Sequence, residues 1–190
     1  TAAVDAKDHY TFNHSENVSL YASKLAEEIG LDREHVEIVR QAGLLHDIGK
    51  IGVPEHILSK KGPLTREEMQ IMQGHVEGSI AMIKYLPSLD YVIPAAIGHH
   101  ERWDGNGYPR GLAGEEIPVG ARCLCVADAF DAMTTKRSYK QALSVEAALD
   151  ELRRNLGVQF DPRIGLAFIK MVEEGKISLP RRDTASAPDA

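Results

Sequence analysis

The chain has 190 residues, of which 43% are hydrophobic and 26% are charged, a composition typical of one globular domain that excludes a disordered or fibrous protein. Its 22 basic and 28 acidic side chains give a net charge of −6, which excludes the overall positive field needed to bind duplex nucleic acid. The two cysteines cannot form a disulfide framework, and every apolar run is shorter than the roughly 20 residues that span a bilayer, so we expect a cytoplasmic protein without membrane contact.

Helical periodicity dominates the sequence and predicts an all-α fold, a single compact helical bundle. The expected helices cover, in chain order, about residues 8–29, 32–46, 65–86, 88–100, 118–134, 144–156 and 162–174. Asp32 is the expected N-cap of the second helix, and Thr65 and Glu68 form the expected capping box of the third. The Gly-rich segment 104–111 is expected to be an irregular loop.

Five of the eight histidines occupy inward-facing positions in this pattern: His14, His46, His75, His99 and His100. One buried imidazole is usually a core residue bonded to backbone, but several without partners would each cost about 1 kcal/mol or more. Asp47 follows His46 directly, and Asp128 lies in the apolar segment 123–130, where an unpaired charge would be unfavourable. We therefore expect a metal centre in the core, and this donor set exceeds one tetrahedral zinc but suits two octahedral ions.

Lys50 lies three residues after Asp47, so on a continuing helix it would project toward the same side. It could protonate or stabilise a leaving oxygen, or it could be a solvent-facing lysine favoured by the helix dipole. The spacing alone leaves both interpretations open.

Several motifs are arranged in a way that resembles one known family. They are HDIGK at 46–50, HHERWDGNGYPRG at 99–111, the spacing Asp8-x-x-Thr11-x-x-His14, and the run from Asp128 to Lys140. Together they resemble the HD-GYP subgroup of the HD phosphohydrolase superfamily. The resemblance implies a catalytic domain, which we place at 1–179, and the small polar tail at 180–190 is expected to be flexible.

The resemblance implies a metal-dependent phosphodiesterase that hydrolyses cyclic di-GMP to linear pGpG, with further cleavage to GMP left open. It implies two divalent ions, iron or manganese, with nickel or zinc as alternatives, and a hydroxide between them that attacks phosphorus. Some family members hold a third ion with a glutamate, but Tyr10 occupies that position here, so we expect two ions.

Site residues follow from the same resemblance. The first ion is assigned to His14, His46, Asp47 and Asp128, and the second to His75, His99 and His100, with Asp47 bridging the two. Asp47 and Lys50 are the expected catalytic residues. Substrate binding is assigned to Gly107, Tyr108, Pro109, Asp131, Arg137 and Lys140.

Two alternatives remain at this point. The same chemistry could act on cyclic GMP-AMP, or the domain could be a cyclic di-GMP sensor that cleaves slowly or not at all. All seven expected ligands are present, together with Lys50, which disfavours a loss of catalysis. An upstream sensory or receiver domain and a homodimer are further partners that the sequence leaves open.

Overall fold

The structure, a computed structural model, describes residues 13–86, 88–135 and 141–177. The described helices are α2 (His14–Glu28), α3 (Arg33–Leu45), η1 (Ile48–Gly52), α4 (Glu55–Leu58), α5 (Arg66–Gln73), α6 (His75–Ile83), η2 (Asp90–Val92), α7 (Ile93–Ile97), η3 (Gly114–Glu116), α8 (Val119–Thr134), α9 (Val145–Arg154) and α10 (Pro162–Glu173). Across these ranges the only strand-type pairing is an isolated bridge between Leu156 and Phe160. The predicted all-α fold is confirmed.

Capping residues explain where several helices begin. Asp32 accepts a hydrogen bond from the backbone N–H of His35 at the start of α3. Thr65 and Glu68 form the reciprocal capping box at the start of α5. Both caps are as predicted, because each depends only on side chains within one helical turn of the helix start.

Three expected helices differ from the observed ones. A continuous helix over 8–29 is wrong, because Asn13 has a left-handed φ of 90° and α2 begins after it. The helix expected over 65–86 ends at Gly74, whose N–H reaches two carbonyls of the preceding turn, and α6 begins there. The helix expected over 88–100 shortens to α7 after η2, so His99 and His100 lie in the turn that follows.

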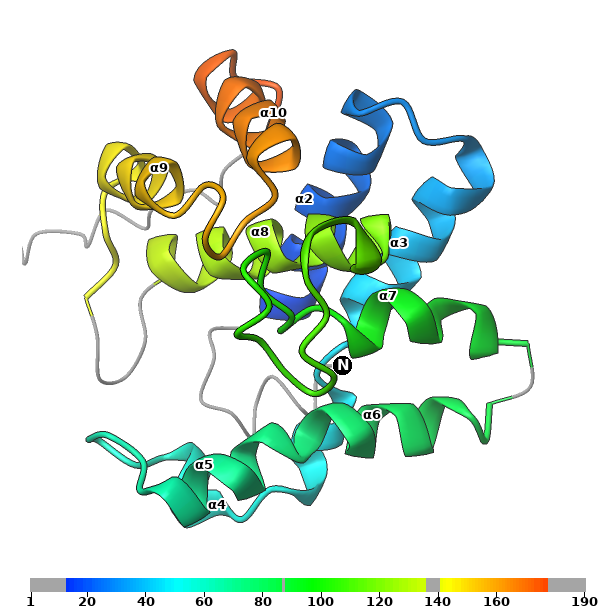
Figure 1. Cartoon of the computed structure of the whole chain (residues 1–190), viewed down its shortest axis with the longest axis vertical. Helices are drawn as coiled ribbons and strands as arrows, with labels where there is room; N and C mark the ends of the chain where they lie inside the picture. The colour runs from blue at the N-terminus through cyan, green and yellow to red at the C-terminus, as the bar shows by residue number, and fades with distance from the viewer. Residues whose placement is uncertain (1–12, 87, 136–140, 178–190) are drawn as a thin grey trace, which may run out of the picture.

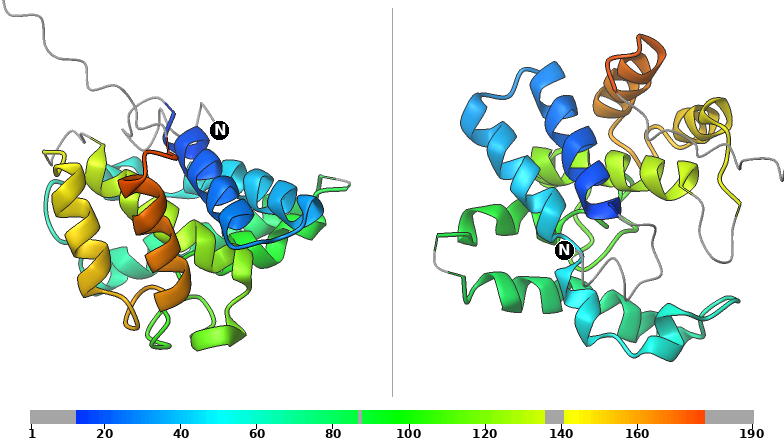
Figure 2. Two further views of the ribbon diagram at one scale, coloured as in Figure 1. Left: turned by 90° about the horizontal axis from the view of Figure 1, so that it is seen from above. Right: turned by 180° about the vertical axis from the view of Figure 1, so that it is seen from behind.

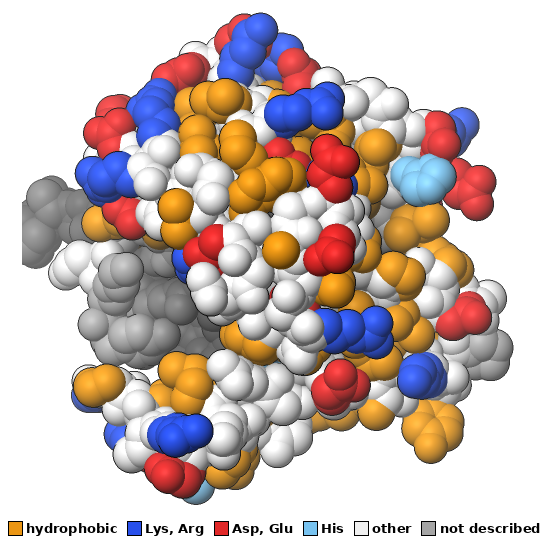
Figure 3. Space-filling model, viewed as in Figure 1, with side chains coloured by type: hydrophobic (Ala, Val, Ile, Leu, Met, Phe, Trp, Pro, Cys, Tyr) orange, Lys and Arg blue, Asp and Glu red, His pale blue; other side chains and the backbone are white. Residues whose placement is uncertain are grey.

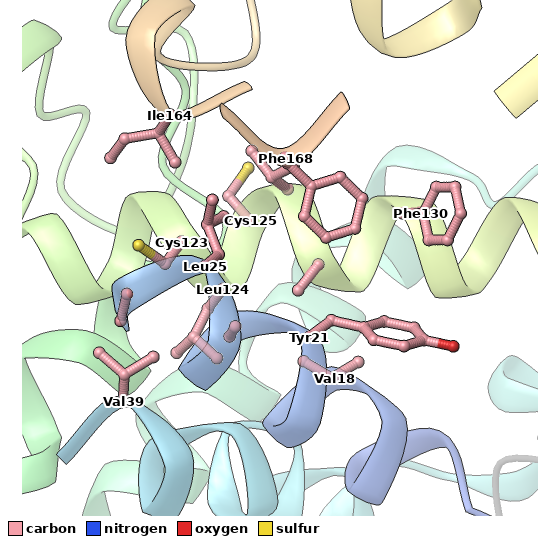
Figure 4. Close-up of a cluster of buried hydrophobic side chains, with 14 of the residues drawn as sticks. Val18, Tyr21, Leu25, Val39, Cys123, Leu124, Cys125, Phe130, Ile164 and Phe168 are labelled. Atoms are coloured by element: carbon pink, nitrogen blue, oxygen red, sulfur yellow. The ribbon is translucent and has the colours of Figure 1, made fainter. Parts of the chain in front are cut away.

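The main core surrounds α8, which runs through the centre of the molecule in Figure 1 and packs against α2, α3, α7, α9 and α10. Figure 2 shows α2 lying across α8 when the molecule is seen from behind. The rings of Tyr21, Phe130 and Phe168 meet edge to face in this core, with centroids 5.0–6.4 Å apart (Figure 4). Cys123 and Cys125 are free thiols buried in the same core, on α8.

A second, smaller apolar cluster lies outside the main core. It consists of buried Val53, Ile57 and Leu58, with Leu64 and Met72 packed against them. This cluster joins α4 to α5 at the lower edge of Figure 1. Since α5 has no buried residue, contacts with the main core contribute little to the stability of α4 and α5.

The surface carries both signs of charge. Figure 3 shows acidic and basic side chains interspersed over the face that it displays. Among residues 13–86, 88–135 and 141–177, no helix has the length and apolar character needed to cross a membrane.

Candidate metal centre

The five inward histidines and Asp47 converge on one place in the fold. Two groups of ligand atoms, each within 4.8 Å of one another, share Asp47: the first is Asp47, His75, His99 and His100, and the second is His14, His46 and Asp47. Oδ1 of Asp47 lies 3.2 Å from Nε2 of His75, and Oδ2 lies 3.3 Å from Nε2 of His46. A carboxylate shared in this way has the position expected of a bridging ligand.

Asp128 joins the second group from α8. Its Oδ1 lies 3.3 Å from Nε2 of His14. The structure therefore brings all seven expected ligands together from α2, the end of α3, the start of α6, the turn after α7, and α8. Their roles as metal ligands stay a prediction.

Three of the histidines are oriented by backbone carbonyls close to them in the chain. Each Nδ1 contacts the carbonyl oxygen three residues earlier: His46 with Gly43 at 2.8 Å, His75 with Met72 at 2.6 Å, and His99 with Ala96 at 2.5 Å. A carbonyl oxygen only accepts, so Nδ1 must donate, and Nε2 then carries the lone pair that a metal ion requires.

Those Nε2 atoms fit a bound cation. Nε2 of His46, His75 and His99 and Oδ1 of Asp47 are buried, and none has a hydrogen-bond partner within the described ranges. Leaving polar atoms buried without partners is unfavourable, and a divalent ion would satisfy all of them. Neutral imidazoles with carboxylates are a donor set that binds iron, manganese, nickel or zinc.

His14 is held by a carboxylate instead of a carbonyl. Its Nδ1 lies 2.6 Å from Oδ2 of Asp131, and Asn17 donates to the other oxygen of that carboxylate at 2.9 Å. Burial lowers the pKa of His14, but hydrogen bonds to Asp128 and Asp131 outweigh it and raise the pKa to about 10. In the absence of an ion, this imidazole carries a proton that a metal must displace.

The substrate contact expected for Asp131 is wrong. Its carboxylate is 0% exposed and is occupied by His14 and Asn17, with Thr135 donating to it at 3.3 Å. Asp131 lies three residues after Asp128 on α8, which places both on one face of the helix. That spacing is the signal from which a supporting role could have been predicted.

Asp47, His99 and His100 have protonation states that favour metal binding. Burial lowers the pKa of His46, but Asp47 outweighs it and raises that pKa, so a metal must compete with a proton there as at His14. Burial opposes ionisation of Asp47, but His46 and Lys50 outweigh it and hold its pKa well below the ordinary value. Burial lowers the pKa of His99 well below its usual range and that of His100 to about 4. Near neutral pH the carboxylate is therefore charged and these two imidazoles are neutral.

Lys50 points into the centre, and the solvent-facing interpretation is wrong. Its side chain is 9% exposed, and Nζ lies 2.7 Å from Oδ2 of Asp47. After Asp47 the chain continues as the 3₁₀ helix η1, in which residues three apart eclipse one another. This tighter winding brings the ammonium group back over the carboxylate.

The turn that carries Asp47 is held against α6 by a close approach of backbone. A Cβ on Gly49 would lie 2.0 Å from the carbonyl oxygen of His75 and 2.4 Å from the backbone nitrogen of Ser79. The Gly49 N–H donates to Oγ of Ser79, and that hydroxyl donates to the carbonyl of His46, both at 2.8 Å. Only glycine fits here, and Ser79 satisfies two backbone groups of the turn.

The loop containing Gly107, Tyr108 and Pro109 lies directly against His100. The Tyr108 N–H donates to the His100 carbonyl at 3.2 Å, and the two rings stack with centroids 4.7 Å apart. Gly107 and Tyr108 line a cavity of about 440 Å³ that His99, His100 and Asp128 also border. Pro109 is exposed beside them and follows a cis peptide bond. Substrate binding by these loop residues stays a prediction.

Two other expected substrate ligands, Arg137 and Lys140, lie outside the described residues, as do Asp8, Tyr10 and Thr11. The sequence alone does not single out Glu101, which the structure places beside the centre with 2% exposure. From the sequence, a glutamate directly after two histidines could be a further ligand or a solvated acid. In the structure its carboxylate instead accepts the backbone N–H groups of Arg110 and Leu112.

Comparison with known proteins places this geometry in a family. A model of the HD domain matches residues 2–164. The chain belongs to the HD-domain family. The resemblance indicated by the sequence motifs is thereby confirmed. Curated relatives include a cyclic di-GMP phosphodiesterase of Thermotoga maritima, 41% identical over 170 residues. The response regulator RpfG of Xanthomonas campestris pv. campestris, also named a cyclic di-GMP phosphodiesterase, is 42% identical over 170 residues.

Another curated relative is the 3′3′-cGAMP-specific phosphodiesterase 2 of Vibrio cholerae, 38% identical over 164 residues. These matches cover 88%, 88% and 85% of this chain but 46%, 45% and 31% of the relatives. The chain thus spans less than half the length of the curated relatives that it matches.

Solved structures confirm the fold. The V. cholerae cyclic GMP-AMP phosphodiesterase V-cGAP3 superposes with a TM-score of 0.71, covering 92% of this chain and 48% of that one at 19% identity. The protein Bd1817 of Bdellovibrio bacteriovorus gives a TM-score of 0.67 at 19% identity, covering 84% of this chain and 51% of the other. The predicted helical HD-domain bundle is the fold of this chain.

Proposed function

We propose that this chain is the catalytic domain, over residues 1–179, of a metal-dependent phosphodiesterase that hydrolyses cyclic di-GMP to linear pGpG. The observation that carries the proposal is Asp47, a buried carboxylate shared by two groups of inward-facing imidazoles. Relatives named as cyclic di-GMP phosphodiesterases support the same activity. Cytoplasmic location and an upstream regulatory domain stay predictions.

The proposed ligand sets divide around Asp47. His14, His46, Asp47 and Asp128 would hold one divalent ion, and His75, His99 and His100, with Asp47 shared, would hold a second; iron and manganese both suit these donors. Two such ions supply the charge that neutralises phosphate oxygens and lowers the pKa of an attacking water.

The protein's own groups account for the rest of the mechanism. Lys50 keeps an ammonium group 2.7 Å from Asp47 in a buried position, where it can donate a proton to the leaving ribose oxygen. Displacement of a ribose oxygen at phosphorus opens the ring and leaves a 5′-phosphate and a free 3′-hydroxyl. Because Lys50 is held by the η1 turn, its proton is placed before substrate arrives.

The cavity beside the centre is proposed to accept one nucleotide half of the substrate. Its volume of about 440 Å³ lies within the range of small-molecule pockets. Polar side chains of Gln73, Asn106 and Gln159 line it, together with the ring of Tyr108, and such groups can contact both the edge and the face of a base. Arg137 and Lys140 are proposed to bind the phosphates.

The test combines metal counting with product analysis. Protein purified without oxygen and loaded with Fe²⁺ or Mn²⁺ should contain two ions per chain and convert cyclic di-GMP to pGpG. Asp47→Ala should lose both the ions and the activity. Asp150→Ala is the matched control, because Asp150 is an exposed aspartate on α9, and it should leave both unchanged.

Each negative outcome addresses one part of the proposal. Two bound ions without cleavage of cyclic di-GMP would overturn the activity, and Asp47→Ala protein that keeps both ions would overturn the shared-ligand site. The cGAMP-specific relatives make 3′3′-cGAMP the second substrate to assay. A larger kcat/KM for 3′3′-cGAMP would reassign the substrate, and tight binding with no product would indicate a sensor.

A further inference from the structure

Glu101 is a buried carboxylate that the proposed mechanism does not use. It follows His100 directly and is 2% exposed. Its Oε1 accepts the N–H of Arg110 at 2.7 Å, and its Oε2 accepts the N–H of Leu112 at 3.1 Å. Among the described residues no lysine or arginine forms an ion pair with it. Two backbone donors thus offset the cost of burying this charge.

These two hydrogen bonds close the loop that contains Tyr108. Glu101 stands at its start, and the two amides that it binds stand at its end. Inside the loop, Gly107 packs so tightly on the start that a Cβ would lie 2.4 Å from the Arg102 nitrogen and 2.6 Å from the His100 carbonyl oxygen. The carboxylate therefore sets how the middle of the loop lies over His100.

His100 differs from the other candidate ligands in how its ring is held. His14, His46, His75 and His99 each have an Nδ1 contact to a carboxylate or a carbonyl. The ring of His100 makes no hydrogen bond to a described residue. Its contacts are with other rings: Tyr108 at 4.7 Å with an interplanar angle of 25°, and the imidazoles of His99 and His75 at 4.0 and 5.2 Å.

We propose that Glu101 is a positioning residue of the metal centre: it holds the loop in place, and the ring of Tyr108 then fixes the orientation of the His100 imidazole. The stacked ring orients His100, as a hydrogen-bonded carbonyl or carboxylate orients each of the other four histidines. The proposal rests on the proposed function for the role of His100 as a ligand. Groups that orient metal ligands typically contribute 10- to 100-fold to metal affinity.

The main experiment is a Mn²⁺ titration of Glu101→Gln, with free Mn²⁺ measured by electron paramagnetic resonance. Glutamine keeps the size of the side chain but replaces one acceptor oxygen by an NH₂ group, which faces an N–H donor. One of two Mn²⁺ equivalents should bind about tenfold more weakly or worse, with the other unchanged. Turnover should fall at limiting Mn²⁺ and recover in excess Mn²⁺, which a general loss of structure would not allow.

Trypsin gives a readout of the loop that needs neither metal nor substrate. Arg110 is exposed, and its own N–H is one of the two held by Glu101. Cleavage after Arg110 in the metal-free protein should therefore be about tenfold faster in Glu101→Gln than in the wild type. Losing one charge-assisted hydrogen bond increases the population of the open, cleavable loop by about this factor.

Glu116→Gln is the matched control. Glu116 also accepts a backbone N–H, that of Ala113 at 3.2 Å, but it is exposed and lies beyond the loop. It should change neither the Mn²⁺ affinity nor the cleavage rate. Tyr108→Leu is the second variant, for use also if Glu101→Gln does not fold. It should weaken the same Mn²⁺ equivalent while the loop stays resistant to trypsin.

The outcomes separate this proposal from the proposed function. Wild-type Mn²⁺ affinity in Glu101→Gln or in Tyr108→Leu would overturn the positioning role, even if the loop became sensitive to trypsin. Unchanged trypsin resistance in Glu101→Gln would overturn its role in holding the loop. A wild type that binds two Mn²⁺ ions but cleaves no cyclic dinucleotide would overturn the activity alone, because affinity and proteolysis are measured without substrate.

Discussion

The two groups of candidate ligands are positioned by different kinds of contact. His14 and Asp128 lie on α2 and α8, long helices whose apolar side chains fill the main core. His75 lies where η1 meets α6, and there the contact consists of the glycine at 49 and the hydroxyl of Ser79. The group that contains His14 and Asp128 therefore depends on the stability of the core, and the group that contains His75 depends on a few close backbone contacts.

The largest expected effect is a loss of stability caused by a change in the main core. Phe168→Ala removes a fully buried ring on α10 that contacts Tyr21 and Phe130, and it should lower the free energy of unfolding by about 3–5 kcal/mol. Urea unfolding of metal-free protein measures this. Leu166→Ala, on the same helix but 55% exposed, should change it by less than about 0.5 kcal/mol. An equal loss of unfolding free energy in Phe168→Ala and Leu166→Ala would contradict the dependence of this side of the centre on core packing.

Gly49→Ala tests the ligand group that depends on close backbone contacts between η1 and α6. The new methyl group would collide with backbone atoms of α6, so η1 must move, at a cost of about 1–3 kcal/mol in unfolding free energy. Mn²⁺ binding should weaken with it, because the same turn carries Asp47. Gly52→Ala is the control, since nothing lies within 4 Å of its Cβ position. If both variants bind Mn²⁺ like the wild type, the close approach does not position the ligand.

Asp131→Asn should weaken metal binding. The change keeps the shape of the side chain but removes the charge that orients His14, and 10- to 100-fold weaker Mn²⁺ binding is expected. Asp150→Asn on the exposed face of α9 serves as the control. An unchanged affinity would show that α2 packing alone orients the imidazole.

The last expected effect is a pH dependence of metal affinity. The pKa of His14 is raised to about 10 by Asp128 and Asp131 against the effect of burial, so the metal-free site holds a proton that a metal must release. Lower pH favours the metal-free form, and Mn²⁺ affinity should rise about tenfold per pH unit. Titrations at pH 6.5, 7.5 and 8.5 measure the slope. A flat profile would mean that His14 binds no proton in competition with the metal.

Features within one helix could be predicted from the sequence. The inward positions of His14 and His46 follow from their spacing to apolar neighbours, and the Asp32 cap follows from local chemistry alone. Features that depend on contacts between segments could not. The close approach of Gly49 to α6, where Ser79 accepts its N–H from 30 positions later, has no signal within either segment. The spacing of Lys50 leaves its direction open, because the sequence does not show that the chain winds as the 3₁₀ helix η1 after Asp47.

The two thiols of α8 have a practical consequence. Cys123 and Cys125 are buried in the main core, and burial raises the pKa of each to about 12. Almost no thiolate exists near neutral pH, and Cys123 is 0% exposed, whereas Cys125 borders the cavity beside the metal centre, so alkylating reagents such as iodoacetamide can reach Cys123 only after the helix becomes exposed. The rate of alkylation of Cys123 therefore reports the free energy of opening this core directly, with no probe added to the protein.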